Sequence, residues 1–357
     1  MKKSILFIHL LNDYSGSPRV LQSVINSAIH NGDEVRVLTS SGEGFLSHIL
    51  GASYSYVPYT FFKNKLIALI NYIIWQFVVF CKVLFMPHRF QIIYINTMHP
   101  FGAAIAAMVR GNKIIYHIHE TSIKPALLKK WLRWVIRMAA DEIIYVSAYL
   151  KDSENIEGKK THVIYNALSH DFQQIPFQEH RKKNTFEVLM LCSLKKYKGV
   201  DEFVDFANCL PEIHFRLVLN TSSEEIDYYF KGISIPSNLS LHSSTRDVHS
   251  FYRNADLVMN LSHRGAWIET FGMTIAEAFS YGIPVIVPEV GGIAELVNQD
   301  ENGYKLNHDK TDEICLAIST LAGNYDRHMR MRRHAYQYAA RFNIQAFYRE
   351  IVSVIHS

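Results

Sequence analysis

The chain has 357 residues, of which 48% are hydrophobic and 20% are charged, and its formal net charge is +4. This length and composition predict a globular protein of about two domains, and the small net charge gives no reason to expect nucleic acid as a partner. The cysteines have no paired spacing, which argues against a disulfide framework and a zinc site and is typical of the reducing cytoplasm. They are Cys81, Cys192, Cys209 and Cys315.

The first half of the chain alternates short apolar runs with helical stretches such as Val20–His30. Alternation of this kind predicts a parallel sheet with right-handed crossovers. The first apolar run is short and ends at Asn12 and Asp13, so we interpret it as a buried strand rather than a signal peptide. The strands predicted in this half are Ser4–Leu10, Glu34–Leu38, Ile92–Ile95, Lys113–His117, Glu142–Val146 and His162–Tyr165.

The turn after the first strand, residues 12–20, contains one glycine, Gly16, followed by Ser17. It lacks the G-x-G-x-x-G pattern that is typical of nicotinamide-dependent enzymes. One glycine before a helix still lets a ligand approach the backbone closely. A plain tight turn is the alternative interpretation.

Two helical stretches of the first half have an unusual mixture of side chains. Leu66–Met86 is strongly apolar and aromatic, but polar residues interrupt it, which predicts a buried or interfacial helix rather than a clean membrane span. Further on, basic residues surround leucine and tryptophan, as in a helix on an anionic membrane surface. A core-packed helix with a solvated basic face is the alternative. These basic residues are Lys124, Lys129, Lys130, Arg133 and Arg137.

The strand Lys113–His117 leads into a His-x-His pair formed by His117 and His119. A histidine at the end of a strand can donate a hydrogen bond to a sugar hydroxyl or to a phosphate. Because side chains alternate along a strand, one of the two is expected in the core, and we predict that His119 is the functional one. A metal site is the alternative, but the sequence shows no third ligand nearby.

A polar stretch, residues 169–184, separates these elements from a second alternating series and is predicted to link two domains. The second series predicts another parallel sheet. Its expected strands are Phe186–Cys192, His214–Leu219, Leu239–His242, Leu257–Asn260 and Val285–Val287, and its expected helices include one from Asp201 and one over Thr274–Phe279.

Two loops of the second series carry groups that suit a nucleotide sugar. The lysine-rich loop Leu191–Gly199 follows a strand, and its cations could hold a diphosphate and stabilise it as it leaves. Further on, Glu269 precedes a helix and Glu277 lies about one turn inside it. Gly272 bares the backbone N–H groups at the start of that helix, and such groups attract a phosphate. The alternatives are a solvated lysine loop and a solvated helix face.

The stretch 267–278, with the proline-flanked strand and Gly-Gly that follow it, resembles the Glu-x7-Glu signature of retaining glycosyltransferases with the GT-B fold, in particular family 4. The resemblance implies an α/β fold of two Rossmann-like domains whose parallel sheets face across a cleft. It implies an acceptor domain over 1–168, a nucleotide-sugar donor domain over 169–325, and C-terminal helices over 326–357 that cross back to the first domain. It also implies an enzyme without a metal or cofactor, and the absence of Asp-x-Asp from the sequence agrees with this.

The resemblance also assigns roles to single residues. It implies that Glu269 contacts the donor sugar, Glu277 the ribose and Lys198 the diphosphate. Ser193 stands where the family has an arginine, a place that the neighbouring Lys195 or Lys196 could fill. The predicted catalytic residues are Glu269, His119 and Lys198, and the predicted donor-binding residues are Gly16, Ser17, Asn166, Ser193, Lys198, Thr270, Phe271, Gly272, Met273, Thr274 and Glu277.

The implied function is retaining transfer of a hexose-type sugar from a UDP- or GDP-sugar to a saccharide in bacterial surface polysaccharide synthesis, such as lipopolysaccharide, capsule or exopolysaccharide. The basic and aromatic surface suggests a lipid-linked acceptor, and therefore a peripheral protein on the cytoplasmic face of the plasma membrane. Two alternatives stay open. One is a nucleotide-sugar epimerase of the same fold, and the other is a non-catalytic membrane-surface subunit, which the altered Ser193 and Gly16–Ser17 positions suggest.

Overall fold

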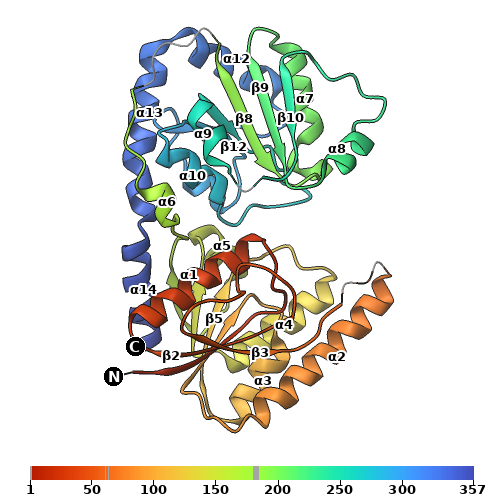
Figure 1. Ribbon diagram of the computed structural model, residues 1–357, viewed down its shortest axis with the longest axis vertical. Helices are drawn as coiled ribbons and strands as arrows, with labels where there is room; N and C mark the ends of the chain where they lie inside the picture. Colours follow the sequence, from red (N-terminus) through yellow and green to blue (C-terminus); the bar gives the residue numbers. More distant parts are fainter. Residues whose placement is uncertain (1, 61, 63, 180–184, 246) are drawn as a thin grey trace. The chain divides into compact units, whose positions relative to one another are not determined.

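The computed structural model describes residues 2–60, 62, 64–179, 185–245 and 247–357. It divides into two compact units, residues 1–167 with 344–357 and residues 168–343 (Figure 1). Each unit consists of a parallel sheet with helices against both faces, which is the arrangement that right-handed crossovers between parallel strands produce. The predicted α/β fold with two Rossmann-like domains is confirmed. The division falls one residue before the predicted boundary at 168.

The sheet of the first unit has seven parallel strands in the order β3-β2-β1-β4-β5-β6-β7. Its inner strands are apolar along nearly their whole length and buried, because helices cover both faces. The strands are β1 (Ser4–Ile8), β2 (Glu34–Thr39), β3 (Ala52–Tyr56), β4 (Ile92–Asn96), β5 (Lys113–Ile118), β6 (Glu142–Tyr145) and β7 (Lys160–Val163).

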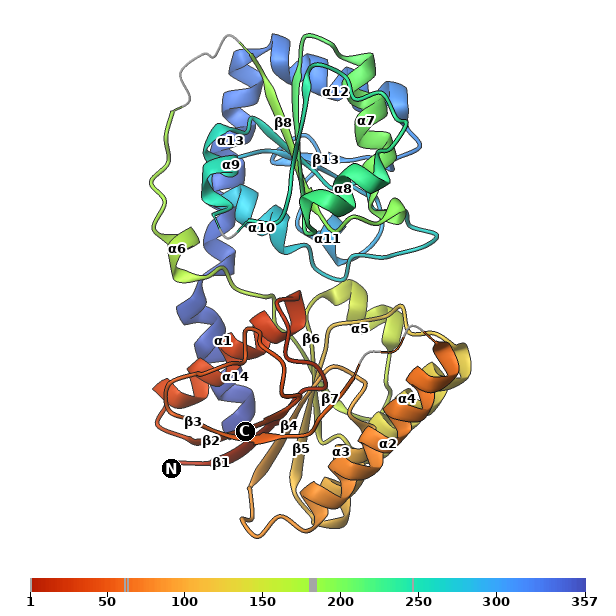
Figure 2. The ribbon, with the colours of Figure 1, turned by 45° about the vertical axis from the view of Figure 1, so that its right-hand side comes forward.

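The helices of the first unit form two groups (Figures 1 and 2). On one face, α1 (Gly16–His30) packs against α14 (Ile344–His356), and residues of both join one buried cluster with β1 and β2. On the other face, α2 (Lys65–Leu84), α3 (Phe101–Val109) and α4 (Ala126–Ala139) lie side by side. The short helix α5 (Ala148–Glu154) follows β6.

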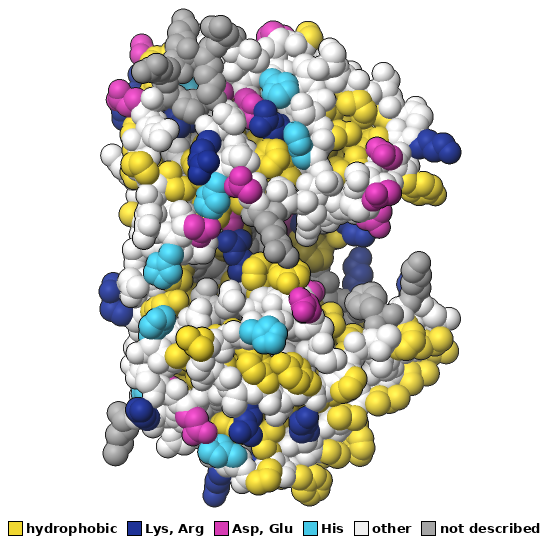
Figure 3. Space-filling view, in the orientation of Figure 1, with side chains coloured by type: hydrophobic (Ala, Val, Ile, Leu, Met, Phe, Trp, Pro, Cys, Tyr) yellow, Lys and Arg dark blue, Asp and Glu magenta, His cyan; other side chains and the backbone are white. Residues whose placement is uncertain are grey.

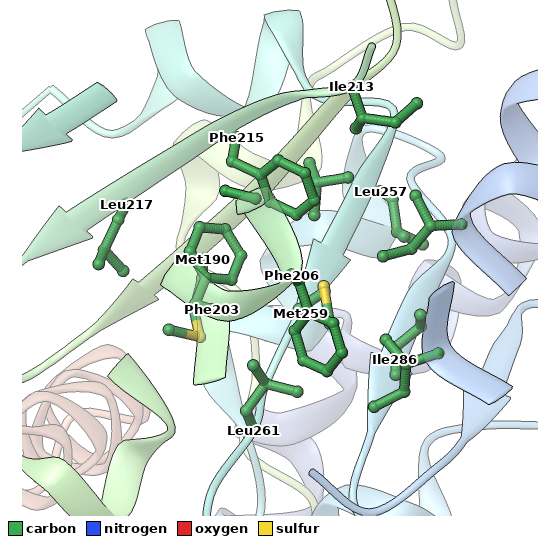
Figure 4. Packing of buried hydrophobic residues seen from close by; sticks show 14 of the residues in the cluster. Met190, Phe203, Phe206, Ile213, Phe215, Leu217, Leu257, Met259, Leu261 and Ile286 are labelled. Carbon is green, nitrogen blue, oxygen red and sulfur yellow. The ribbon is translucent and has the colours of Figure 1, made fainter. Parts of the chain in front are cut away.

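The sheet of the second unit has six parallel strands in the order β10-β9-β8-β11-β12-β13. Between α7 and this sheet lies a core in which Phe203 and Phe206 pack against Met190, Phe215 and Met259 (Figure 4). The strands are β8 (Glu187–Cys192), β9 (His214–Leu219), β10 (Leu239–His242), β11 (Leu257–Met259), β12 (Val285–Val287) and β13 (Gly303–Lys305). The helices are α6 (His170–Gln173), η1 (Lys196–Lys198), α7 (Val200–Cys209), α8 (Ser223–Tyr229), α9 (His249–Asn254), α10 (Met273–Ser280), α11 (Gly292–Glu295), α12 (Thr311–Gly323), α13 (Tyr325–Ala339) and η2 (Ala340–Phe342).

The structure differs from the predicted elements mainly at the sheet edges. The strands β3 and β13 were not predicted, because each is short and lies at the edge of its sheet, where polar residues are tolerated. The strand predicted at His162–Tyr165 is wrong by two residues, since β7 pairs with β6 from Lys160 onward. The predicted linker contains the helix α6, and its residues 180–184 lie outside the described residues.

The C-terminal helices also differ from their prediction. We expected the whole segment 326–357 to return to the first domain, but α13 belongs to the second unit and only residues 344–357 belong to the first. The reason is visible in α13, whose buried His328 and Arg332 bond to the backbone of Asp256 and Tyr281 in the second unit.

Candidate functional site

The loop after β8 is held against the loop after β11 by a close approach of their backbones. Gly199 has a φ of +80°, and a Cβ placed there would lie 2.3 Å from the Cβ of Leu261 and 2.7 Å from its carbonyl oxygen. Only glycine satisfies both the left-handed backbone and this contact. The amide N–H of His263 also donates to the carbonyl of Tyr197 at 2.8 Å. The carboxyl ends of two neighbouring strands are thereby joined, which is where ligands bind in open parallel sheets.

This junction brings together two residues that the sequence predicted to be catalytic. The ammonium of Lys198 donates to Oε1 of Glu269, and both side chains are largely buried. Ser262 donates from Oγ to the same carboxylate oxygen at 3.1 Å, and the Lys198 ammonium lies 5.0 Å from the ring centre of Trp267. The site therefore holds a fixed cation beside a fixed carboxylate.

The helix α10 begins next to this pair. Gly272 precedes it with a φ of +97°, and a Cβ there would lie 2.6 Å from the side chain of Ile293, whose own amide donates to the carbonyl of Glu269 at 3.4 Å. The N-cap residue of α10 is therefore a glycine, which has no side chain to cap the helix. The N–H groups of a first helical turn attract an anion, and anion binding here stays a prediction.

Glu277 lies in α10, one turn from its start, and is buried with a side chain that points toward α9. The hydroxyl of Tyr252 in α9 donates to Oε2 of Glu277 at 2.9 Å. Nothing in the sequence singled out Tyr252, because its pairing with Glu277 depends on how α9 and α10 pack. A carboxylate held in this way has its orientation fixed before a ligand arrives.

The remaining predicted donor-binding residues of the second unit differ in how deeply their side chains are buried. Thr270, Met273 and Thr274 are half-buried around the start of α10, but Phe271 is buried with its ring 5.8 Å from that of Phe342. The side chain of Phe271 therefore belongs to the core, and only its backbone can border a ligand. Ser193 is half-buried in the loop after β8.

Neither lysine that could replace the arginine expected at position 193 is held near the Lys198–Glu269 pair. Lys195 is exposed, and Lys196 is 80% exposed with its ammonium 3.6 Å from the carboxylate of Asp201. An exposed, flexible lysine can still reach a bound diphosphate, but it is not positioned in advance. The fixed positive charge of this loop is Lys198.

In the first unit, the half-buried His119 contacts buried polar residues at the carboxyl ends of β1, β4 and β5. Its Nε2 lies 2.7 Å from Oδ1 of Asn96, and Nδ2 of Asn96 lies 3.1 Å from Nδ1 of His9 and donates to the carbonyl of Ser17 at 3.1 Å. Asn96 therefore connects the predicted His119 to the Gly16–Ser17 turn. Neither Asn96 nor His9 was predicted as a site residue, because His9 lay inside the predicted strand Ser4–Leu10 and Asn96 lay just beyond the predicted strand Ile92–Ile95.

Among the described residues, Gly16 has open space beside it and Asn166 has a buried oxygen without a hydrogen-bond partner. A Cβ on Gly16 would meet no described atom within 4 Å, so the protein's own packing does not require glycine there. Asn166 is buried, and its Oδ1 has no hydrogen-bond partner among the described residues. Buried acceptors are normally paired, so both positions are consistent with ligand contact. Their roles remain predictions.

The histidines of this group are neutral at pH 7. Burial lowers the pKa of His9 to about 4 and that of His117 to about 3, and burial followed by the proximity of His117 and His9 holds the pKa of His119 well below its usual value. Without a ligand, His119 is therefore neutral and can donate or accept a hydrogen bond. His117 points into the core, where Nδ1 bonds to the hydroxyl of Tyr94 at 2.8 Å. The prediction from alternation was wrong in its reason, because residues two positions apart lie on the same face of a strand, and the rings of His117 and His119 are 4.3 Å apart. His119 is the more exposed of the two because it lies beyond the end of β5.

These lowered pKa values predict that acid destabilises the fold. Below the ordinary histidine pKa of 6.5, His117 takes up a proton in the unfolded chain but not in the native protein. The free energy of unfolding therefore falls as the pH drops. Between pH 7.5 and 5.5 this histidine contributes a loss of about 1.4 kcal/mol. In urea unfolding at both pH values, His117→Gln should lose about that much less than the wild type. An equal loss in both proteins would show that His117 has the same pKa in the native and unfolded states.

Two family sequence profiles match the chain. The profile described as Glycosyltransferase Family 4 matches residues 14–172, and the profile described as Glycosyl transferases group 1 matches residues 171–338. Together they cover most of both units. The chain belongs to glycosyltransferase family 4.

Relatives of known activity either have low sequence identity to this chain or match only a short part of it. N-acetyl-alpha-D-glucosaminyl L-malate synthase of Bacillus anthracis is 22% identical over 255 residues, which are 66% of this chain and 66% of the synthase. D-inositol 3-phosphate glycosyltransferase of Nocardia farcinica is 35% identical over 92 residues, which are 26% of this chain and 20% of that protein. The matched segments thus cover at most 66% of these two relatives.

Solved structures match the chain over nearly its whole length. HepE from Anabaena, in complex with UDP and glucose, has a TM-score of 0.80 at 20% identity and covers 99% of this chain and 100% of its own. WaaG, a glycosyltransferase involved in lipopolysaccharide biosynthesis, has a TM-score of 0.74 at 14% identity and covers 98% of this chain and 99% of its own. These likenesses establish the GT-B fold.

Proposed function

We propose that the protein is a retaining, metal-independent glycosyltransferase that moves a hexose-type sugar from a UDP- or GDP-sugar to a saccharide. The observation that carries this proposal is the Lys198–Glu269 pair at the start of α10, a helix whose N-cap residue is a glycine. A fixed cation and a helix N-terminus suit a diphosphate, and carboxylates suit hydroxyls. Glu277, one turn further on, supplies a second carboxylate in the same unit.

Each of these groups has a defined part in the proposed reaction. Glu277 binds the ribose and Glu269 the sugar, while Lys198 and the first N–H groups of α10 stabilise negative charge on the departing diphosphate. The acceptor hydroxyl attacks the sugar on the face from which the diphosphate leaves, and the diphosphate takes the proton of that hydroxyl. This route needs no nucleophilic side chain. That HepE was solved with UDP-glucose supports a nucleotide sugar as the donor.

We also propose that the protein is peripheral on the cytoplasmic face of the plasma membrane and acts on a lipid-linked acceptor in surface polysaccharide synthesis. The support is α2, which is long and apolar enough to span a membrane and exposes large apolar side chains along most of its length. They cover the lower right of Figure 3, where α2 lies. The exposed side chains of α2 and its end are Leu66, Ile67, Leu69, Ile70, Ile73, Ile74, Phe77, Val78 and Phe85.

The opposite face of α2 is fixed to α3, which favours a helix lying on a membrane rather than crossing it. Trp75 and Gln76 are buried, and Gln76 accepts from the amide of Gly102 at 2.8 Å and donates to the carbonyl of His99 at 3.0 Å. A Cβ on Gly102 would lie 2.1 Å from the carbonyl oxygen of Gln76, so the two helices touch through their backbones. A spanning helix would have to break these contacts.

The neighbouring helix α4 extends the proposed membrane surface. Trp131 and Trp134 stack on each other with ring centres 5.1 Å apart and are both exposed, as interfacial tryptophans are. Of the basic residues predicted to line this helix, Lys129 and Arg133 face Glu154 at 2.6 and 3.6 Å instead. Anionic lipid would therefore be attracted by the exposed remainder, which are Lys124, Lys130 and Arg137.

Nucleotide binding tests the proposed donor site. In titration calorimetry with UDP, GDP, ADP and CMP, we expect one diphosphate to bind and Glu277→Ala to weaken its binding by about 10-fold or more, because ribose bonds to a charged group are lost. Tyr252→Phe, which removes only the hydroxyl that orients Glu277, should weaken it by about 2- to 10-fold. Glu212→Ala, at an exposed position of the same unit, is the control.

The outcomes separate the proposed function from its alternatives. Binding that Glu277→Ala leaves unchanged would place the donor elsewhere. Binding without transfer, but with a change in the sugar of the donor itself, would indicate an epimerase. No binding by any nucleotide would favour the non-catalytic membrane-surface subunit. Nuclear magnetic resonance of the product's anomeric proton would decide between retention and inversion.

A further inference from the structure

Three side chains that the proposed reaction does not use converge at the carboxyl edge of the second sheet. Glu202 lies in the first turn of α7, His263 in the loop after β11, and His308 in the loop after β13. Each offers one atom that can bind a metal ion, and these atoms all lie within 4.8 Å of one another. The sequence predicted no metal site, because the three residues are far apart along the chain.

Polar contacts within this group leave one atom unsatisfied. Nε2 of His263 and Oε1 of Glu202 form an ion pair at 2.8 Å, but the other carboxylate oxygen of Glu202 is buried without a hydrogen-bond partner among the described residues. Nδ1 of His308 lies 3.7 Å from the same Oε1. Two ligands of one zinc ion, each about 2.1 Å from it, lie about 2.9–3.4 Å apart, and the two histidine nitrogens lie 2.8 and 3.7 Å from Oε1 of Glu202.

The two imidazole rings stack on each other, with centres 3.8 Å apart and planes 22° apart. A metal ion binds the in-plane lone pair of a neutral imidazole, so sharing one ion requires one ring to turn out of this stack. The Glu202 carboxylate offsets the positive charge of an ion, and all three side chains are about three-quarters buried.

We propose that Glu202, His263 and His308 form a binding site for one divalent transition-metal ion of the zinc class, with solvent in the remaining position. Two imidazoles and one carboxylate are a ligand set that zinc accepts. The amide of His263 donates to Tyr197, next to Lys198, and Glu202 begins the helix that follows Gly199. The ion would therefore fasten the loop that carries Lys198 to the loop that leads to Glu269. Its role is to hold the two loops, and it takes no part in sugar transfer.

The metal alone tests the site, independently of any nucleotide. After treatment with a chelator, the full-length protein should bind about one equivalent of Zn²⁺ in calorimetry and gain thermal stability. Co²⁺ should give the visible absorption of a low-coordinate site. His308→Gln and the nearly isosteric Glu202→Gln should each weaken Zn²⁺ binding by at least about 10-fold. His214→Gln, which changes a histidine 3.5 Å from Glu187 in the same unit, should leave it unchanged.

The chain has 18 histidines, so the control matters. Equal Zn²⁺ binding by the wild type and both site variants, or none by the wild type, would overturn the proposal. Circular dichroism of each variant without metal excludes a loss of folding as the cause. The influence on the loops rests on the proposed function and is read from nucleotide affinity with and without Zn²⁺. Zn²⁺ binding without nucleotide binding would keep the metal site and reject the proposed donor site.

Discussion

The Lys198→Ala variant is expected to transfer sugar with a kcat about 10²- to 10³-fold below that of the wild type. The Lys198 ammonium is held by Glu269 and lies over Trp267, so it stays in place while negative charge develops on the leaving diphosphate. Removing it takes away this stabilisation and leaves the carboxylate of Glu269 without its counterion. The KM for the donor should change less than kcat, because the charge to be stabilised is larger in the transition state.

Two further variants make this prediction specific. Lys196→Ala removes a lysine of the same loop that is 80% exposed and points to Asp201, and we expect it to change kcat by less than about 3-fold. Glu269→Gln keeps the shape of its side chain but loses the charge, and should also lower kcat strongly. Initial rates with the donor identified by calorimetry measure all three. A Lys198→Ala enzyme of normal kcat would show that the leaving group is stabilised by other groups.

Replacing two exposed apolar residues of α2 is expected to release the protein from lipid. Ile74 and Phe77 are 56% and 66% exposed, so a membrane would bury these side chains. A charged glutamate at either position would stay in water. Burial of each side chain contributes about 1.5 kcal/mol or more, so the double variant Ile74→Glu/Phe77→Glu should bind vesicles containing phosphatidylglycerol at least about 100-fold more weakly. Co-sedimentation with vesicles measures the partition coefficient.

The control for this variant is Leu316→Glu, which changes a leucine that is 69% exposed in α12 of the second unit. It should bind vesicles like the wild type. The α2 variant should also keep its activity on a short soluble acceptor, because its buried face against α3 is unchanged. Vesicle binding that persists in the α2 variant would place the lipid contact elsewhere and reject the proposed orientation.

Some residues of the candidate site were predicted from the sequence and others were not, and the difference has a physical reason. Lys198, Glu269 and Glu277 were predicted because they lie in two loops and a helix whose local pattern resembles that of the family, and their roles stay predictions. Tyr252 and Asn96 were missed because each acts through a partner far along the chain, 25 residues away for Tyr252 and Glu277 and 79 for Asn96 and Ser17. No local pattern marks such a residue before the fold brings the two together.

The helix α2 was likewise predicted only in part from the sequence. Its composition predicted a buried or interfacial helix, but the sequence could not say which face would be covered. The structure decides this: Trp75 and Gln76 are buried, and Gln76 bonds to Gly102 of α3. The residues on either side of them are exposed, namely Ile73, Ile74, Phe77 and Val78. Likewise, Lys129 and Arg133 looked available to lipid until the fold placed the buried Glu154 next to them.

The sequence by itself determined the alternation of strands and helices, and so the two parallel sheets, because strand and helix periods are local properties of the chain. It also determined the loops that carry Lys198 and Glu269. Only the tertiary structure decided that α13 stays with the second unit while residues 344–357 join the first, and that Glu202, His263 and His308 meet. These facts depend on contacts between distant segments, which no local pattern encodes.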